Sequence, residues 1–181
     1  MIRNTIIIVV AILAGSWGFY TASNWRPAND GVQTLDKHDF ARVGDFRPAF
    51  SHESISGAVD TIDNYSGKVV LLNFWATWCA PCREDMPMLQ ALHSEFGSEG
   101  FQVLGIALDH AERVREFVTE LGIEYPNLFG SGDVILTGLN YGNSSGTLPY
   151  SVLIDREGII RWREHGEINR RLFSQRLKQL L

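Results

Sequence analysis

The stretch Lys68–Cys82 reads KVVLLNFWATWCAPC and decides the fold of the chain. Its first part, Lys68–Ala76, is an almost unbroken apolar run, which predicts a central parallel strand that helices cover on both faces. Apolar residues at helical spacing follow and stop at Gly97, so the strand leads directly into an amphipathic helix. These helix residues are Met86, Leu89, Leu92 and Phe96. Both cysteines, Cys79 and Cys82, therefore lie where the helix begins.

The rest of the chain alternates strand and helix patterns. The expected strands are a short hairpin at Phe50–Val59, a second buried strand at Phe101–Leu108, and a third strand at Tyr150–Ile154 with its hairpin partner at Ile159–Trp162. One expected helix runs from Ala111 to Leu121 and stops at Gly122. An amphipathic C-terminal helix contains Leu172, Phe173, Leu177, Leu180 and Leu181. Parallel strands joined by helices, then an antiparallel hairpin and a helix, predict an α/β domain of three layers. Helices flank a central mixed sheet in such a domain.

The segment Asn127–Gly146 interrupts this alternation because it contains five glycines. That content is too high for one stable helix, since glycine is a poor helix former. We expect a connecting insertion near the site, with at most a short helix at Asp133–Tyr141.

The N-terminus carries a targeting or anchoring segment in residues 1–25. After Arg3, the 22 residues Asn4–Trp25 contain no charge, and as a helix they would extend about 33 Å, enough to span a bilayer core. Two interpretations stay open, an uncleaved membrane anchor and a cleaved signal peptide with a poor cleavage site near Ala22. Either one places the rest of the chain outside the cytoplasm, with residues 26–44 as a linker and 45–181 as the domain.

Composition excludes several other classes of protein. Of the 181 residues, 45% are hydrophobic and 20% charged, which is ordinary for a globular domain and argues against disorder. The net charge of −5 argues against a broad nucleic-acid-binding surface. The two cysteines form one tight C-x-x-C motif, so they do not staple distant parts of the fold.

The C-x-x-C motif carries the chemistry. A helix N-terminus directs unpaired N–H groups and the positive end of its dipole at Cys79, which favours the thiolate. Cys82 lies one turn further on and can attack a mixed disulfide, so the spacing favours thiol–disulfide exchange. Half of a zinc site and two inert core cysteines are the alternatives. A zinc site needs two more ligands, and His93, His110 and His165 are scattered along the chain.

Two segments, Leu72–Pro87 and Thr147–Gly158, resemble signatures of the thioredoxin-like family. More narrowly, residues 45–181 resemble the TlpA/ResA-like thiol-disulfide oxidoreductases, which are anchored to the membrane of the bacterial cell. The resemblance implies a nucleophilic Cys79, a resolving Cys82, no cofactor and no metal. It also implies a single N-terminal span in the inner membrane, with the catalytic domain in the periplasm or cell envelope.

The same resemblance assigns a substrate-binding face. Pro149 corresponds to the family's cis-proline, which turns the Leu148 backbone toward a bound polypeptide, and Trp78 would line the same face. From the residues alone, Pro149 also reads as an ordinary proline at the entry to a strand. For Trp75 we expect packing in the core.

One position departs from thioredoxin itself, which has a buried aspartate where this chain has Asn73. Asparagine cannot exchange a proton, so the proton relay that the aspartate provides in thioredoxin is missing here. The narrower family carries an acidic residue three positions after the second cysteine, here Asp85, which would accept the proton of the Cys82 thiol. The alternative is that Asp85 only stabilises the first turns of the helix. We expect its neighbour Glu84 to lie at the surface.

The sequence does not fix the direction of electron flow. We expect a reductase of protein disulfides, because the resemblance implies a thiol-transporting electron donor in the inner membrane and protein substrates such as apocytochrome or metalloprotein cysteines. An oxidase or isomerase with the same motif is the first alternative, and a copper or zinc carrier that uses the thiols as ligands is the second. A peroxidase would need a threonine–arginine peroxide site, which we do not find.

Overall fold

The computed structural model describes residues 40–181. The expected anchor or signal at 1–25 and most of the linker at 26–44 lie outside the described residues. Within residues 40–181, no helix is both long and apolar enough to cross a bilayer. The described residues 40–181 belong to one compact unit by their internal contacts. Ala41, from the expected linker, is buried and exchanges hydrogen bonds with the body of this unit, donating to Asn140 and accepting from Arg163.

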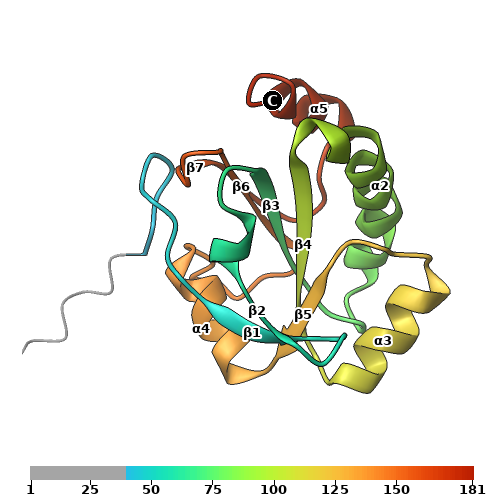
Figure 1. Cartoon of the computed structure of the whole chain (residues 1–181). Coiled ribbons are helices and arrows are strands. Elements are labelled where there is room, and N and C mark those ends of the chain that lie inside the picture. Colours follow the sequence, from blue (N-terminus) through green and yellow to red (C-terminus); the bar gives the residue numbers. More distant parts are fainter. Residues whose placement is uncertain (1–39) are drawn as a thin grey trace, which may run out of the picture. The chain divides into compact units, whose positions relative to one another are not determined.

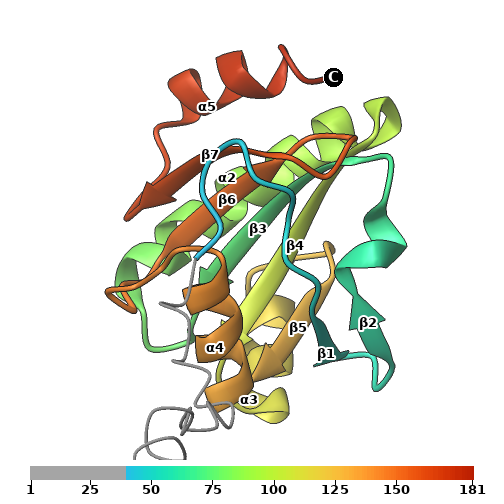
Figure 2. The same ribbon diagram turned by 90° about the vertical axis from the view of Figure 1, so that its left-hand side faces the viewer.

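A seven-stranded mixed sheet forms the centre of this unit, in the order β2-β1-β5-β4-β3-β6-β7 (Figures 1 and 2). The strands are β1 (Ser51–Ser54), β2 (Val59–Thr61), β3 (Val69–Trp75), β4 (Phe101–Leu108), β5 (Asn127–Gly130), β6 (Tyr150–Ile154) and β7 (Ile160–His165). The helices are α2 (Ala80–Phe96), α3 (Ala111–Glu120), α4 (Gly132–Asn140) and α5 (Arg170–Leu177), with short 3-10 turns η1 (Ile62–Tyr65) and η2 (Gly97–Glu99). The predicted α/β class, hairpins and mixed sheet are confirmed.

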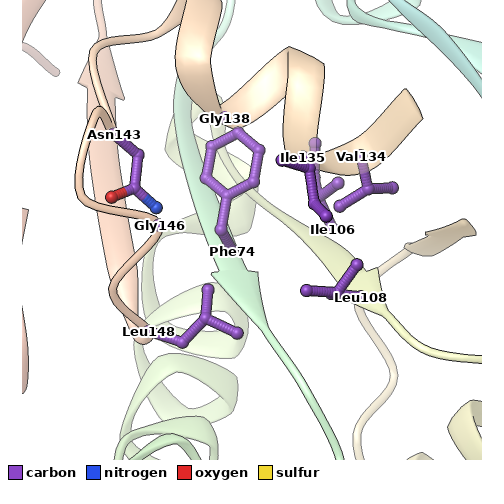
Figure 3. Close-up of a pocket in the computed structure, with 9 residues that line it drawn as sticks. All are labelled: Phe74, Ile106, Leu108, Val134, Ile135, Gly138, Asn143, Gly146 and Leu148. Carbon is purple, nitrogen blue, oxygen red and sulfur yellow. The ribbon is translucent and has the colours of Figure 1, made fainter. Parts of the chain in front are cut away.

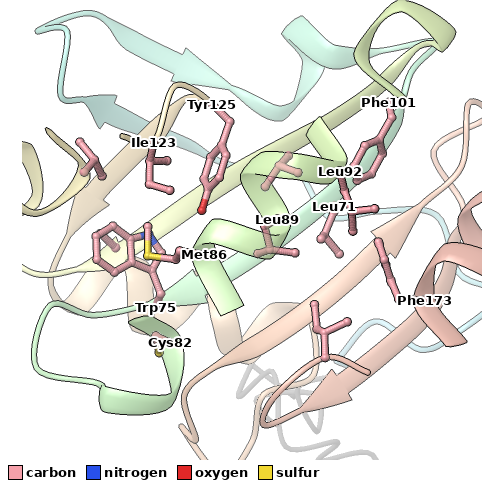
Figure 4. Close-up of a cluster of buried hydrophobic side chains, with 14 of the residues drawn as sticks. Leu71, Trp75, Cys82, Met86, Leu89, Leu92, Phe101, Ile123, Tyr125 and Phe173 are labelled. Carbon is pink, nitrogen blue, oxygen red and sulfur yellow. The ribbon is translucent and has the colours of Figure 1, made fainter. Parts of the chain in front are cut away.

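Strand β3 lies at the middle of the sheet and is buried along its whole length. It pairs in parallel with β4 and antiparallel with β6. Because side chains alternate across a strand, Leu71 and Trp75 face a core cluster formed with α2, α3 and α5 (Figure 4), and Leu72 and Phe74 face a second cluster formed with α4 and η1. The two clusters make the three layers that the sequence predicts.

The segment 127–146 is more regular than the expected connecting insertion. Asn127–Gly130 forms β5, which pairs in parallel with β4 and antiparallel with β1. The sequence analysis missed this strand because it is four residues long and its pairing partners lie far away in the chain. The expected short helix is present as α4, and Val134 and Gly138 on its buried face lie against the sheet opposite α2 (Figure 2).

Candidate active site

The two cysteines lie at the N-terminus of α2, where the sequence placed them. Cys79 is the N-cap residue of α2, with extended backbone dihedral angles, and Cys82 lies in the first turn. The pair forms a disulfide with a Cα–Cα distance of 5.3 Å. In this oxidised state Cys79 is only 5% exposed and Cys82 only 1%. Both cysteines are therefore almost fully covered in the disulfide, and Cys79 is only slightly more exposed than Cys82.

Local sequence explains why the helix starts at this point. β3 ends at Trp75, and the Cys79 N–H donates to the carbonyl of Ala76, which closes the turn between strand and helix. Pro81 lies in the first turn of α2, where its missing N–H removes no intrahelical bond. The first N–H groups of α2 and the positive end of the dipole are thus directed at Cys79, an environment that lowers the pKa of a thiol.

A contact that sequence reasoning missed fixes the loop before the cysteines. The Thr77 hydroxyl donates a hydrogen bond to a carboxylate oxygen of Asp109, which follows β4. The other oxygen of Asp109 accepts the N–H of His110 at 2.9 Å and lies 3.8 Å from Arg113. Asp109 therefore ties the cysteine loop to the start of α3. No local signal in the sequence links Thr77 to a residue so far along the chain.

The two tryptophans near the cysteines occupy opposite environments. Trp75 is fully buried, and its indole N–H donates to Asn127 Oδ1 at 3.0 Å, as befits the predicted core residue. Trp78 is 65% exposed and is among the most exposed large apolar residues of the described chain. An exposed tryptophan directly before the disulfide offers a large apolar contact surface beside it.

The Leu148–Pro149 peptide bond is cis, in agreement with the resemblance. Tyr150, the first residue of β6, pairs with Phe74 of β3. Pro149 is thus level with the C-terminal end of β3, at the same end of the sheet as the cysteine loop. Leu148 is partly buried and packs against the core cluster that contains both cysteines. The geometry brings Leu148 and Pro149 to the cysteine end of the sheet.

Asp85 is buried on the inner face of α2, with 6% of its surface exposed. Its carboxylate accepts the main-chain N–H of Ile168, at 3.1 Å and 3.3 Å from its two oxygens. Burial raises the pKa of Asp85 to about 6; the Ile168 N–H opposes this, and the charges of Glu167 and Glu84 add to it. Glu84 is exposed, as predicted. Asp85 is therefore more than a surface acid in the first turns of the helix.

Several further polar side chains are buried in the domain. The Asn73 amide donates to the Ser151 hydroxyl at 3.1 Å, which sequence reasoning did not anticipate. Within residues 40–181, Asn73 Oδ1, Tyr125 Oη and His93 Nδ1 are buried without a hydrogen-bond partner. Burial, and secondarily the charge of Asp85, raise the pKa of Tyr125 far above its ordinary value, so its hydroxyl stays protonated.

Residues 40–181 contain no cluster of three or more His, Cys, Asp and Glu side chains arranged to hold a metal ion. The arrangement of the site instead suits exchange between thiols and disulfides, because a cysteine pair, a buried carboxyl and an exposed apolar face meet at one end of the sheet.

Comparison with known proteins agrees with this chemistry. The model of the AhpC/TSA family matches residues 43–163. The chain belongs to the AhpC/TSA family. Among curated members, the thiol-disulfide oxidoreductase ResA of Bacillus thuringiensis is 28% identical over 175 residues, which cover 96% of this chain and 94% of that protein. ResA of Oceanobacillus iheyensis is 38% identical over 132 residues, covering 68% of this chain and 64% of that protein.

Solved structures of relatives have the same fold. A putative thiol:disulfide interchange protein DsbE from Chlorobium tepidum is 28% identical with a TM-score of 0.71, and the match covers 77% of this chain and 98% of that one. A putative protein disulfide isomerase from Bacteroides thetaiotaomicron is 29% identical with a TM-score of 0.69, covering 78% and 91%. These similarities confirm the predicted family. The chain is a thioredoxin-like thiol-disulfide oxidoreductase of the ResA/DsbE type, with Cys79–Cys82 as its redox pair.

Proposed function

We propose that the protein is a reductase of protein disulfides that works outside the cytoplasm. The Cys79 thiolate attacks one sulfur of a substrate disulfide and forms a mixed disulfide, which releases the first substrate thiolate. The Cys82 thiolate then attacks Cys79 Sγ and releases the second. Two electrons pass to the substrate, and the pair is left as the Cys79–Cys82 disulfide.

The burial of Asp85 one turn beyond Cys82 carries this proposal. Because the pKa of Asp85 is raised to about 6, the carboxyl is a far better proton acceptor than an ordinary aspartate, while it is still largely ionised at neutral pH. It accepts the proton of the Cys82 thiol during resolution. No comparable acceptor is available at Asn73, whose amide cannot take up a proton.

A reductase for proteins also needs a surface that accepts a polypeptide. Trp78 supplies an exposed apolar side chain next to Cys79. The cis peptide bond before Pro149 presents the Leu148 backbone at the same end of the sheet, and a substrate chain in extended conformation can form main-chain hydrogen bonds there.

The cell must return two electrons to the pair after each turnover. The chain has no third cysteine to relay them, so the donor acts in trans. We assign residues 1–25 as the membrane anchor and 26–44 as the linker that keeps the domain near a thiol-transporting donor in the inner membrane. Apocytochrome or metalloprotein cysteines in the periplasm or cell envelope are the substrates that the family resemblance suggests. N-terminal sequencing of membrane-bound protein should begin near Met1, whereas a start near Ser23 would indicate a cleaved signal.

An oxidase or isomerase is the second candidate, since the Bacteroides thetaiotaomicron relative described above is a putative protein disulfide isomerase. The redox state in living cells separates the two functions. Cells are quenched in acid, free thiols are alkylated with a bulky maleimide, and the mobility shift of the full chain is measured. A reductase is mostly reduced and becomes oxidised when the membrane thiol donor is deleted. A fully disulfide-bonded pair in wild-type cells would contradict the reductase and favour an oxidase.

Stoichiometric copper or zinc in the purified chain would instead support a metal carrier.

A further inference from the structure

An apolar pocket lies between α4 and the sheet, on the face opposite α2 (Figure 3). Phe74 and Leu108 from the sheet and Val134 from α4 contribute to its walls, and the half-exposed Ile135 lines it from the helix. The pocket is small and partly open to solvent, and its lining is almost entirely apolar. A partly open pocket with this lining favours an apolar side chain over a polar one.

Leu148 and Leu108 connect the pocket to the end of the sheet at which the cysteine loop lies. Leu148, the residue before the cis-proline, forms part of its wall, and in Figure 3 it lies with Leu108 at the end away from Gly138. Leu108 also borders a neighbouring, more open hollow lined by Trp78. Leu108 thus lines both the apolar pocket and the hollow beside Trp78, the residue that precedes Cys79.

The backbone at Leu148 is free to pair with another chain. Within residues 40–181, neither its N–H nor its carbonyl takes part in a hydrogen bond. The Asn143 side chain holds the loop by donating to the Thr147 carbonyl at 3.0 Å. Successive side chains of an extended strand point to opposite sides. A strand paired at Leu148 therefore directs alternate side chains toward the cysteines and toward the α4 face.

We propose that this pocket between α4 and the sheet is a specificity site that takes an apolar side chain of an extended polypeptide substrate, close to the substrate cysteine. The inference rests on the proposed action on protein disulfides and adds a preference for sequence around them. It gives α4 and the glycine-rich segment a role in substrate selection, because Val134, Ile135 and Gly138 of α4 and Asn143 and Gly146 of the loop line the pocket.

Gly138 offers a precise way to change the pocket. It lies on the buried face of α4, and a Cβ added there would be 3.8 Å from the Phe74 ring and from Asn143 Cβ, an ordinary van der Waals distance. Gly138→Ala should fold normally and narrow the pocket, and Gly138→Leu should fill it. Gly132→Ala is the matched control, because it is on the same helix and a Cβ at Gly132 meets nothing within 4 Å.

The test uses the reduced full chain and measures second-order rate constants for reduction of disulfide peptides. A scan places phenylalanine or glycine at each position flanking the peptide cysteine, and glutathione disulfide serves as a small substrate without such a side chain. We expect wild type to prefer phenylalanine at one position by about tenfold or more. Gly138→Ala should reduce this preference, Gly138→Leu should abolish it, and Gly132→Ala should retain it. Rates with glutathione disulfide should agree among all four proteins.

Equal rates for the phenylalanine and glycine peptides, or a preference that survives Gly138→Leu, would overturn the pocket assignment and leave the reductase intact. An equal loss on peptides and on glutathione disulfide in Gly138→Leu would also overturn it, because the cysteine site itself would then be disturbed. A wild-type dimer that Gly138→Leu dissociates would assign the pocket to a second copy of the chain. Failure of wild type to reduce any of these disulfides would instead contradict the proposed function.

Discussion

The carboxylate of Asp85 accepts the main-chain N–H of Ile168 at 3.1 Å, across 83 positions of the sequence. This bond ties the first turns of α2 to the segment that precedes α5. It stabilises the ionised carboxylate, yet burial is the stronger influence and the pKa of Asp85 is raised to about 6. A carboxyl that titrates close to neutrality, one turn beyond Cys82, has measurable consequences for both reactivity and stability.

Replacing Asp85 with asparagine should remove a proton acceptor without removing the acceptor for the Ile168 N–H. Resolution of a mixed disulfide at Cys79 should slow by about 100-fold above pH 6, because general base catalysis is lost. The pH profile of wild type should show a step near pH 6 that Asp85→Asn lacks. Stopped-flow measurement of resolution tests this.

Glu84→Gln is the matched control for that experiment. Glu84 is exposed and raises the pKa of Asp85 only through its charge. Its loss should keep the step in the pH profile and move it slightly to lower pH. A profile of Asp85→Asn that coincides with wild type would leave Asp85 without a catalytic role.

Asp85→Asn should also stabilise the fold at neutral pH. The pKa of Asp85 rises from 3.8 to about 6 on folding, so the folded state binds its proton more tightly and wild type loses stability as the pH rises between these values. Asp85→Asn should therefore match wild type below about pH 4 and exceed it above about pH 6, by up to about 3 kcal/mol in the free energy of unfolding. Urea unfolding of the oxidised proteins across this range measures the difference. A variant less stable than wild type at neutral pH would contradict the burial argument.

The two tryptophans should separate substrate binding from stability. Trp78→Ala should change the free energy of unfolding by less than about 0.5 kcal/mol, because Trp78 is 65% exposed. It should still slow the reduction of protein disulfides more than that of glutathione disulfide. Trp75→Ala should lose about 3–5 kcal/mol of stability, since Trp75 is fully buried. Denaturant melts and rates with both substrates test the contrast, and equal rate losses on both substrates in Trp78→Ala would remove Trp78 from the substrate face.

Single cysteine variants should reveal which sulfur attacks. Cys79 caps α2 at its N-terminus, so Cys82→Ser should accumulate mixed disulfides with envelope proteins while Cys79→Ser should not. Non-reducing gels of alkylated extracts show the trapped species. The opposite pattern would reverse the assignment of nucleophile and resolving thiol.

The parts of the fold that could be predicted are those coded by local pattern. The apolar runs of β3 and β4 and the helical spacing in α2 and α3 set these elements almost to the residue, because burial on both faces or on one stripe leaves a direct periodic signal. Strand β5 left no such signal, since Asn127–Gly130 is a strand only through its pairing with β4 and β1.

The same distinction applies to the site. The position of Cys79 and Cys82 at a helix N-terminus followed from the sequence, whereas the cis bond before Pro149 was expected only from family resemblance. The environment of Asp85 depends on Ile168, and the contact of Thr77 with Asp109 joins two loops. The pocket at Gly138 arises only when α4 packs on the sheet. Such relationships between distant residues are set by tertiary structure.

The reduction potential of the Cys79–Cys82 pair tests the proposed reductase most directly. The reduced and oxidised full chain is equilibrated in graded thiol–disulfide buffers, and the fraction of free thiol is measured by alkylation. We predict a potential more negative than about −220 mV, in the direction of thioredoxin at about −270 mV, so that the pair gives its electrons to substrate disulfides. A potential near about −120 mV, where strong disulfide oxidants lie, would contradict the account.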